Sequence, residues 1–221
     1  DVYKRQRENS ETKEEGIVFI TADKGLCGSF NSNLIKEVAT SLKENQNIFF
    51  YCIGKKGFNF LNKLGSKIEI FKINDKNLNW WDVEEIGNLL IKNYINKKYK
   101  KVEIIFSEFR TSLQQKIIRK QILPIAAFED AENIAKRDFL YEPDEEKVLD
   151  ELLKKYIKTV IFKAIFESQA SEHGVRMVTM DMATKNAGEM IKDLTLLANK
   201  TRQAAITKEI LEVVSGAEAL K

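Results

Sequence analysis

The chain has 221 residues, of which 43% are hydrophobic and 31% are charged, and its net charge at pH 7 is +3. This composition is typical of a soluble globular protein with one or two domains. The charge is too small to indicate nucleic acid or a membrane surface as a partner, and no apolar run of about 18 residues predicts a membrane span. Cys27 and Cys52 are too few for a zinc site and allow at most one disulfide, so a reducing compartment is expected.

Residues 1–16 form a polar start, DVYKRQRENSETKEEG, which we predict to be disordered. It has no initiator methionine, no apolar signal core and no transit-peptide pattern. Because the chain also contains a coiled-coil helix without a partner, we expect an N-terminal segment to be missing from this sequence.

Residues 17–142 predict an α/β domain of the Rossmann-like kind. Short apolar runs predict strands at 17–21, 48–53, 68–71 and 102–106, and residues 116–123 are a candidate for a further strand. Helical spacing of apolar residues is found at about 31–42, 58–64 and 83–96. Strands that alternate with helices predict a parallel sheet with right-handed crossovers. After Pro124 a charged connector extends to Lys136, and residues 137–141 are a candidate last strand.

Residues 143–221 predict one very long C-terminal helix, because Pro143 suits a first helical turn and no proline follows it. The first half of this helix has a wide apolar stripe, which is typical of a helix packed on a globular core. The stripe consists of Leu149, Leu152, Leu153, Tyr156, Ile157, Val160, Ile161, Ala164 and Ile165.

Beyond residue 179 the apolar stripe narrows to two positions per heptad, the period of a supercoiled helix. We call this set of residues the seam: Met180, Ala183, Ala187, Met190, Leu194, Leu197, Thr201 and Ala204. After the seam the apolar positions shift frame and form what we call the tip: Ile206, Ile210, Val213, Val214 and Ala217. The seam requires a partner helix that the chain does not supply, and we expect another protein to bury the tip.

Glycine-containing loops follow two of the predicted strands, at Gly25–Gly28 and Gly54–Gly57. Such loops often bind phosphate, but neither has the ending of a P-loop or the third glycine of a dinucleotide fingerprint, so we favour tight turns with positive φ. His173 is the only histidine and is interpreted as a solvated helix residue. The sequence therefore predicts no catalytic residue, no metal site and no cofactor.

Polar and charged residues surround the point where the seam ends, at Lys200, Arg202, Gln203, Thr207, Lys208 and Glu209. A charged stretch of helix is usually only a solvated face. The alternative is a polar collar that makes directional contacts with an enclosing partner, and the pattern alone leaves both interpretations open.

Two stretches are specific enough to indicate a family: IVFITADKGLCGSFNSNLIKEV at 17–38 and the C-terminal run at 171–220. Together with EFRTSLQQKIIRKQILPI at 108–125 and YEPD at 141–144, they resemble the gamma subunit of the F-type proton-translocating ATP synthase. The motif loop of that resemblance consists of Gly25, Leu26, Cys27, Gly28, Phe30 and Asn31. The fold that it implies is a Rossmann-like α/β domain plus a very long C-terminal helix that forms half of an antiparallel coiled coil.

The resemblance also implies a function, that of a non-catalytic rotor shaft that couples proton flow through a membrane ring to ATP synthesis. The implied partners are the alpha and beta subunits of a catalytic hexamer, the epsilon subunit and the membrane proton ring, with no nucleic acid. Arg202, Gln203, Thr207 and Glu209 would contact beta-subunit loops, and Ile206, Ile210, Val213 and Val214 would lie in the hexamer sleeve. Phe139, Tyr141 and Glu142 would lie at the foot, near the ring and epsilon.

The implied location is peripheral, at the cytoplasmic face of a bacterial plasma membrane, with the matrix side of the mitochondrial inner membrane as the second choice. Two other functional classes stay open on the residues alone. One is a small α/β nucleotide-binding enzyme with a helical dimerisation arm, using Gly25–Gly28 for phosphate. The other is a homodimeric coiled-coil scaffold.

Overall fold

The computed structural model describes residues 12–74, 78–112, 114–125, 142 and 144–219. The chain divides into two compact units, residues 1–177 and 178–221. The fold class agrees with the prediction, a Rossmann-like α/β arrangement followed by a very long C-terminal helix.

The first unit is built on a five-stranded sheet with the strand order β3-β2-β1-β4-β5. The strands are β1 (Glu15–Ile20), β2 (Ile48–Ile53), β3 (Lys67–Lys72), β4 (Lys101–Phe109) and β5 (Gln115–Leu123). The first four are parallel, but β5 is antiparallel to β4, so the expectation of a purely parallel sheet was wrong at this edge. The reason is the short connection between β4 and β5, since a parallel crossover needs a dozen or more residues.

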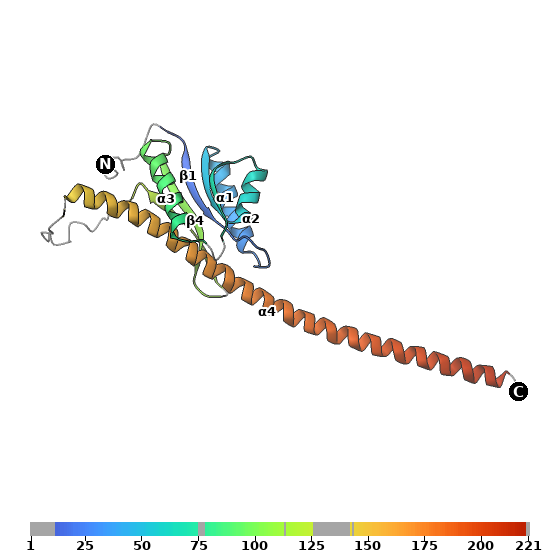
Figure 1. Cartoon of the computed structure of the whole chain (residues 1–221). Helices are drawn as coiled ribbons and strands as arrows, with labels where there is room; N and C mark the ends of the chain where they lie inside the picture. Colours follow the sequence, from blue (N-terminus) through green and yellow to red (C-terminus); the bar gives the residue numbers. More distant parts are fainter. Residues whose placement is uncertain (1–11, 75–77, 113, 126–141, 143, 220–221) are drawn as a thin grey trace. The chain divides into compact units, whose positions relative to one another are not determined.

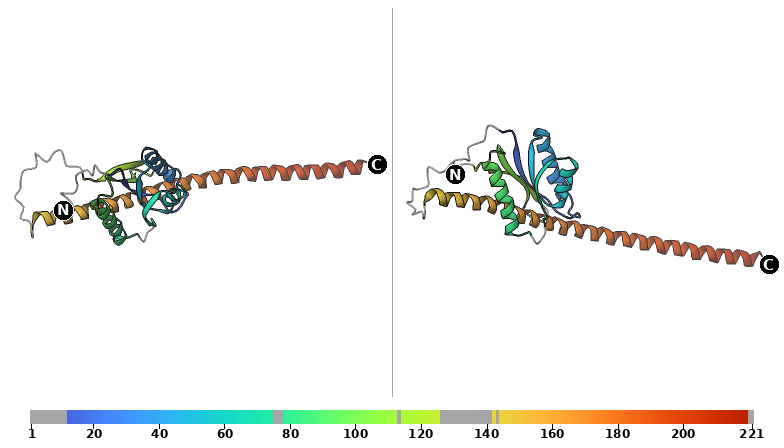
Figure 2. Two further views of the ribbon diagram at one scale, coloured as in Figure 1. Left: turned by 90° about the horizontal axis from the view of Figure 1, so that it is seen from above. Right: turned by 45° about the horizontal axis from the view of Figure 1, so that its top comes forward.

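Besides the long C-terminal helix, three shorter helices cover the two faces of this sheet. They are α1 (Phe30–Glu44), α2 (Lys55–Lys63) and α3 (Trp80–Ile95). Figures 1 and 2 show helices on either side of the sheet. Helices α1 and α2 lie on one face, and α3 lies on the other. Strand β1 begins earlier than predicted, so that Glu15 and Gly16 belong to the sheet rather than to the polar start.

Each face of the sheet has its own apolar core, because successive side chains of a strand point to opposite faces. In β1, Phe19 packs with α1 and α2, whereas Val18 and Ile20 pack with α3 and with the long C-terminal helix. All three side chains are fully buried. Burial on both faces explains why the central strands read as continuous apolar runs.

A buried polar cluster lies where β2 faces α3. The hydroxyl oxygens of Tyr51 and Tyr99 are 3.1 Å apart, and Asn93 Nδ2 donates to Tyr51 Oη at 2.8 Å. Lys98 Nζ donates to Glu69 at 2.6 Å beside them. Burial raises the pKa of Tyr51 to about 12, and burial also raises the pKa of Tyr99 well above its usual value. Both phenols are therefore neutral in the folded protein at ordinary pH.

Helix α4 (Glu145–Glu218) begins after Asp144, whose Oδ1 accepts from the backbone N–H of Lys147 at 2.9 Å. Asp144 therefore acts as the N-cap, which satisfies one of the first free amides of the helix. The Lys147 side chain is also 2.9 Å from this carboxylate, and these contacts lower the pKa of Asp144. Pro143 and the candidate strand at 137–141 lie outside the described residues.

The first part of α4 packs on the globular core, as predicted, but through a narrower surface. It lies on the same face of the sheet as α3. Ile157, Ile161 and Ile165 are fully buried against it. Leu152 and Tyr156 are 57% and 45% exposed, so their assignment to the core-facing stripe was wrong. Residues i and i+4 share a helix face, and Leu152 and Tyr156 are offset from the face that Ile157 and Ile161 define.

In the second unit, residues 178–218 continue as α-helix without a break. At 1.5 Å per residue, this part of the helix is about 60 Å long. Gly188 lies within this helix and does not end it. No atom lies within 4 Å of the position that a Cβ at residue 188 would take.

Candidate functional site

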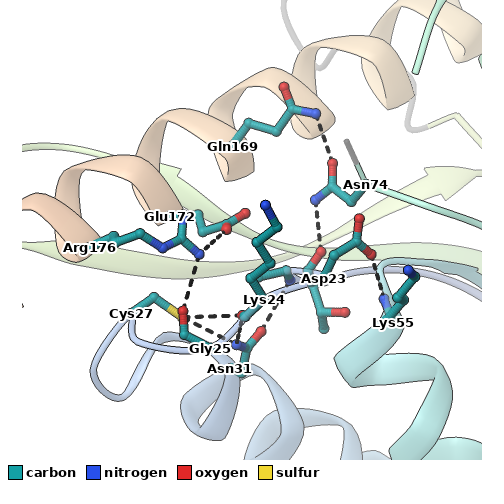
Figure 3. A network of polar contacts seen from close by, with 12 residues as sticks. Asp23, Lys24, Gly25, Cys27, Asn31, Lys55, Asn74, Gln169, Glu172 and Arg176 are labelled. Atoms are coloured by element: carbon teal, nitrogen blue, oxygen red, sulfur yellow. Dashed lines mark hydrogen bonds and ion pairs between the residues drawn. The ribbon is translucent and has the colours of Figure 1, made fainter. Parts of the chain in front are cut away.

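The loop that connects β1 to α1 contains the motif residues Gly25, Leu26, Cys27 and Gly28. Figure 3 labels Gly25 and Cys27 in it. Gly28 has φ of 53°, so the predicted tight turn with positive φ is present there. Gly25 does not adopt this conformation, whereas Leu26 does, with φ of 61°. The left-handed conformation costs an L-residue about 1 kcal/mol, and the Leu26 side chain is 73% exposed and gains little burial in return.

The base of this loop is held by polar contacts to both neighbouring helices. The Ala22 N–H donates to Asn31 Oδ1 at 3.1 Å, and Asn31 Nδ2 donates to the Lys24 carbonyl at 3.4 Å. The Lys55 N–H donates to Asp23 Oδ1 at 2.8 Å. Asn31, a predicted motif residue, therefore shapes the loop, while Phe30 is the buried first residue of α1.

Helix α4 crosses the carboxyl ends of the strands. It forms hydrogen bonds with β4 and with the segment that follows β3. Ser171 Oγ lies 2.9 Å from Ser107 Oγ on β4, and the Phe109 N–H donates to Glu167 at 3.2 Å. Gln169 Nε2 donates to Asn74 Oδ1, beyond β3, at 2.8 Å. This stretch of α4 is thereby fixed to strand ends that are distant in sequence.

Arg176 connects the same helix to the motif loop (Figure 3). Its Nη2 donates to the Gly25 carbonyl at 3.3 Å and forms an ion pair with Glu172, one helical turn earlier. The side chains of Arg176 and Glu172 are only 23% and 9% exposed. The pair therefore lies mostly inside the protein, where an ion pair is less screened than at the surface.

These contacts occupy the place where doubly wound proteins bind ligands. Such sites lie outside the carboxyl ends of the strands, where the strand order reverses, and here this point is between β1 and β4. Residues 167–176 of α4 bond to Ser107 and Phe109 in the last part of β4 and to Gly25 in the loop after β1. A nucleotide at the Gly25–Gly28 loop would have to compete with this helix.

The second glycine loop, Gly54–Gly57, is also closed by the protein itself. The Gly57 N–H donates to Thr21 Oγ1 at 2.9 Å, and the Lys56 N–H donates to the Ala22 carbonyl at 3.1 Å. Gly54 has φ of 104°, and a Cβ there would lie 2.1 Å from the Thr21 carbonyl oxygen. These amides are the groups that would hold a phosphate. The predicted positive φ is present at Gly54, but Lys55, Lys56 and Gly57 form the first turn of α2 and not a loop, so that part of the prediction was wrong.

The cysteines are both buried and both free. Burial raises the pKa of Cys52 to about 12. Burial also raises the pKa of Cys27, an effect that the nearby charge of Arg176 opposes. Thiols of this kind are poor nucleophiles at neutral pH. Among the described residues no group of His, Cys, Asp and Glu is arranged to hold a metal ion, and His173 is exposed.

The seam residues of the second unit lie on the helix surface, where only Met180 is half-buried. The larger ones, Met190, Leu194 and Leu197, are 65%, 57% and 60% exposed. The tip residues Ile206 and Ile210 are exposed to 50% and 58%. Since a helix turns about 100° per residue, the tip lies on nearly the opposite face from the seam.

The predicted collar residues Arg202, Gln203, Thr207 and Glu209 are all exposed. Thr207 Oγ1 donates to the backbone carbonyl of Gln203 at 2.9 Å. This bond does not involve the Gln203 side chain, which stays available to a partner. Of the predicted foot residues, Glu142 is exposed, whereas Phe139 and Tyr141 lie outside the described residues.

Sequence analysis missed the polar contacts that join α4 to the strand ends. The signal for the Glu172–Arg176 pair was present, because opposite charges four residues apart on a helix commonly interact. Its contact with Gly25 was not visible, since 151 residues separate the two in the chain. The buried residues Asn74 and Ser107 gave no sequence signal at all.

No helix in the described part of the chain has the length and apolar character needed to cross a bilayer.

The family model described as ATP synthase matches residues 2–220. The ATP synthase gamma chain of Heliobacterium modesticaldum is 42% identical over 218 residues, which are 95% of this chain and 75% of the relative. The ATP synthase gamma chain of Pelagibacter ubique is 38% identical over 217 residues, with the same coverage of both chains.

Solved structures give a consistent result. A chain in the central stalk and c-ring structure of the Tetrahymena thermophila mitochondrial ATP synthase has a TM-score of 0.65 and 27% identity, with 81% of each chain covered. A chain in a Euglena gracilis mitochondrial ATP synthase structure has a TM-score of 0.70 over 99% of this chain and 80% of that chain. At 20% identity, the second match shows the fold alone.

Proposed function

Because this chain belongs to the ATP synthase gamma chain family, and so to the central stalk of the F-type enzyme, we propose that it is the rotor shaft of that complex. In this role it couples proton flow through a membrane ring to ATP synthesis in a hexamer of alpha and beta subunits. It takes no part in the chemistry and binds the membrane complex peripherally, at the cytoplasmic face in a bacterium.

The observation that best supports this proposal is the exposed apolar surface of the second unit. Leu194, Leu197 and Ile210 are each more than half exposed on a helix about 60 Å long. Exposed apolar surface on this scale marks a protein interface. We propose that the seam packs against an antiparallel helix and that the tip, on the other face, lies in the hexamer sleeve.

The polar collar gives the shaft its means of acting on the hexamer. Arg202, Gln203, Thr207 and Glu209 carry donors and acceptors on one short stretch of helix and make directional contacts with beta-subunit loops. A ligand or partner shifts a conformational equilibrium only by as much as it binds one state better than the other. An asymmetric set of polar contacts supplies such a difference to each catalytic site in turn. At the foot, Phe139, Tyr141 and Glu142 contact the ring and the epsilon subunit.

The proposal is tested by blocking rotation in the assembled complex. In a Glu209→Cys variant, the new thiol is joined to the hexamer through a linker that contains a disulfide. ATP turnover is measured before and after the linker is reduced. A rotor loses turnover in proportion to the crosslinked fraction and regains it on reduction. The unsubstituted chain, whose two cysteines are buried, is the control.

Two results contradict the proposal. Turnover that continues in fully crosslinked complexes indicates a static scaffold. Micromolar affinity of the isolated chain for ATP, measured by equilibrium dialysis, indicates instead the small α/β nucleotide-binding enzyme with a helical dimerisation arm.

A further inference from the structure

The connection between β1 and α1, which contains the motif-loop residues 25–28, is held more firmly at its base than at its tip, Gly25 and Leu26. Asn31 and Asp23 bond to backbone groups of residues 22, 24 and 55, which fixes the first part of the loop. At the tip, Gly25 has no neighbour within 4 Å of the position a Cβ would take. Leu26 is 73% exposed and has an unfavourable φ of 61°. Apolar packing therefore does little to stabilise the tip.

Beneath the tip, the Cys27 side chain is only 2% exposed. Its Sγ accepts from Asn31 Nδ2 at 3.2 Å. Cys27 belongs to the apolar core on the α1 and α2 face of the sheet, so solvent reaches its thiol only when the loop that carries it moves away from this core. The thiol is a natural reporter of the loop conformation.

The contact that reaches the tip from outside the loop comes from α4. Arg176 Nη2 donates to the Gly25 carbonyl at 3.3 Å, and Glu172 holds the guanidinium in place from one turn earlier. Both side chains are largely buried, so the guanidinium is oriented before it meets the loop. Hydrogen bonds from charged groups are stronger than those between neutral groups.

We propose that Arg176 is a positioning residue that keeps the motif loop closed over Cys27 by binding the Gly25 carbonyl. The loop then opens when α4 moves at this point, because the guanidinium is carried by the helix. The exposed Leu26 side chain is presented in one fixed direction only while this contact is intact. The proposal concerns the chain by itself and does not depend on the rotor function.

The test compares thiol labelling of the full-length chain under native conditions. In Arg176→Ala, we expect Cys27 to react with a maleimide about fivefold faster or more, the effect of losing roughly 1 kcal/mol. Cys52, fully buried in β2, is the internal reference, and its rate should not change. Loss of the Arg176 charge by itself raises the pKa of Cys27 and slows labelling, so a faster rate reports opening.

Two variants serve as matched controls. Arg110→Ala removes a guanidinium that pairs with Glu108 at 2.7 Å at an exposed site, and should leave the labelling of Cys27 unchanged. Gly25→Ala keeps the carbonyl and introduces no close contact, so it should label as the unsubstituted chain does.

Arg176→Ala also leaves the Glu172 carboxylate unpaired, and this can unfold the domain, in which case both cysteines label together. The double variant Glu172→Gln with Arg176→Gln removes both charges and, with its shorter side chain at 176, also loses the loop contact. It should raise the labelling of Cys27 relative to Cys52. An unchanged ratio of the two rates in this folded variant overturns the proposal.

Discussion

Gln169 on α4 donates a hydrogen bond of 2.8 Å to Asn74, and Asn74 in turn donates one of 2.7 Å to the Thr21 carbonyl. One buried amide thus links the end of β1, the segment after β3 and the long helix. Replacing Asn74 with alanine should lower the free energy of unfolding by about 1–3 kcal/mol, because buried partners lose their bonds.

Urea unfolding of the full chain measures this difference. Asn33→Ala is the matched control, since Asn33 is exposed and its amide bonds only to Ser29 at 3.2 Å among the contacts described. The control should change stability by less than about 0.5 kcal/mol. Equal effects of the two substitutions would show that the buried link is of little importance.

Gly54→Ala should be strongly destabilising, because a methyl group at this position meets the Thr21 backbone and the backbone has φ of 104°. We expect a loss of about 3 kcal/mol or more, the combined effect of steric overlap and backbone strain. The control is Gly65→Ala, which shares the positive φ but has no close neighbour and isolates the strain alone. Thermal unfolding followed by circular dichroism should place the control between Gly54→Ala and the unsubstituted chain.

The buried tyrosine pair predicts a loss of stability in alkaline solution. The folded-state pKa of Tyr51 is about 12, above the ordinary value of 10, because burial disfavours the phenolate. Above pH 10 the unfolded chain releases this proton while the folded chain retains it, so the free energy of unfolding falls as the pH rises. The pH window for this effect lies between about 10 and 12.

Urea midpoints measured across this window check the prediction, and Tyr51→Phe is the informative variant. Its stability should fall less steeply with pH, because one of the two perturbed phenols is absent. Tyr156→Phe, at an exposed position on α4, should have the same slope as the unsubstituted chain. A slope that is unchanged in Tyr51→Phe would rule out a role for this phenol.

The collar predicts a functional effect without a structural one. Arg202→Ala combined with Gln203→Ala should reduce ATP turnover of the assembled complex several-fold, because both side chains are exposed and are proposed to contact the hexamer. The thermal stability of the chain should be unchanged. Lys192→Ala with Asn199→Ala is the matched double variant, since both positions are exposed on the face opposite the seam. Normal turnover in the first variant would remove the two residues from the contact surface.

Local patterns predicted much of the fold, because they depend on nearby residues. The strand at 48–53 has the predicted bounds, since an apolar run ends there at a glycine that the turn requires. The antiparallel pairing of β5 with β4 was not predicted, although the short connection between the two strands in the sequence indicates it. Leu152 and Tyr156 fit an apolar stripe, yet they are exposed because they are offset from the helix face that Ile157 and Ile161 define.

The candidate site was less predictable, because its contacts join distant segments. Asn31 was identified through the family motif, and the structure assigns it the loop contacts. Arg176 was not among the residues singled out from the sequence, because its contact with Gly25 exists only when the fold brings the two together. The apolar seam, by contrast, could be predicted from the sequence, because its heptad spacing depends on the residues of one helix only.

The segment of α4 at residues 167–176 has a consequence for how this α/β architecture is used. In doubly wound α/β proteins, ligands bind in the crevice outside the carboxyl ends of the strands. Here side chains of α4, among them Ser171 and Arg176, occupy these strand ends. A small molecule that entered here would have to displace α4, and this resistance suits the rotor shaft proposed above.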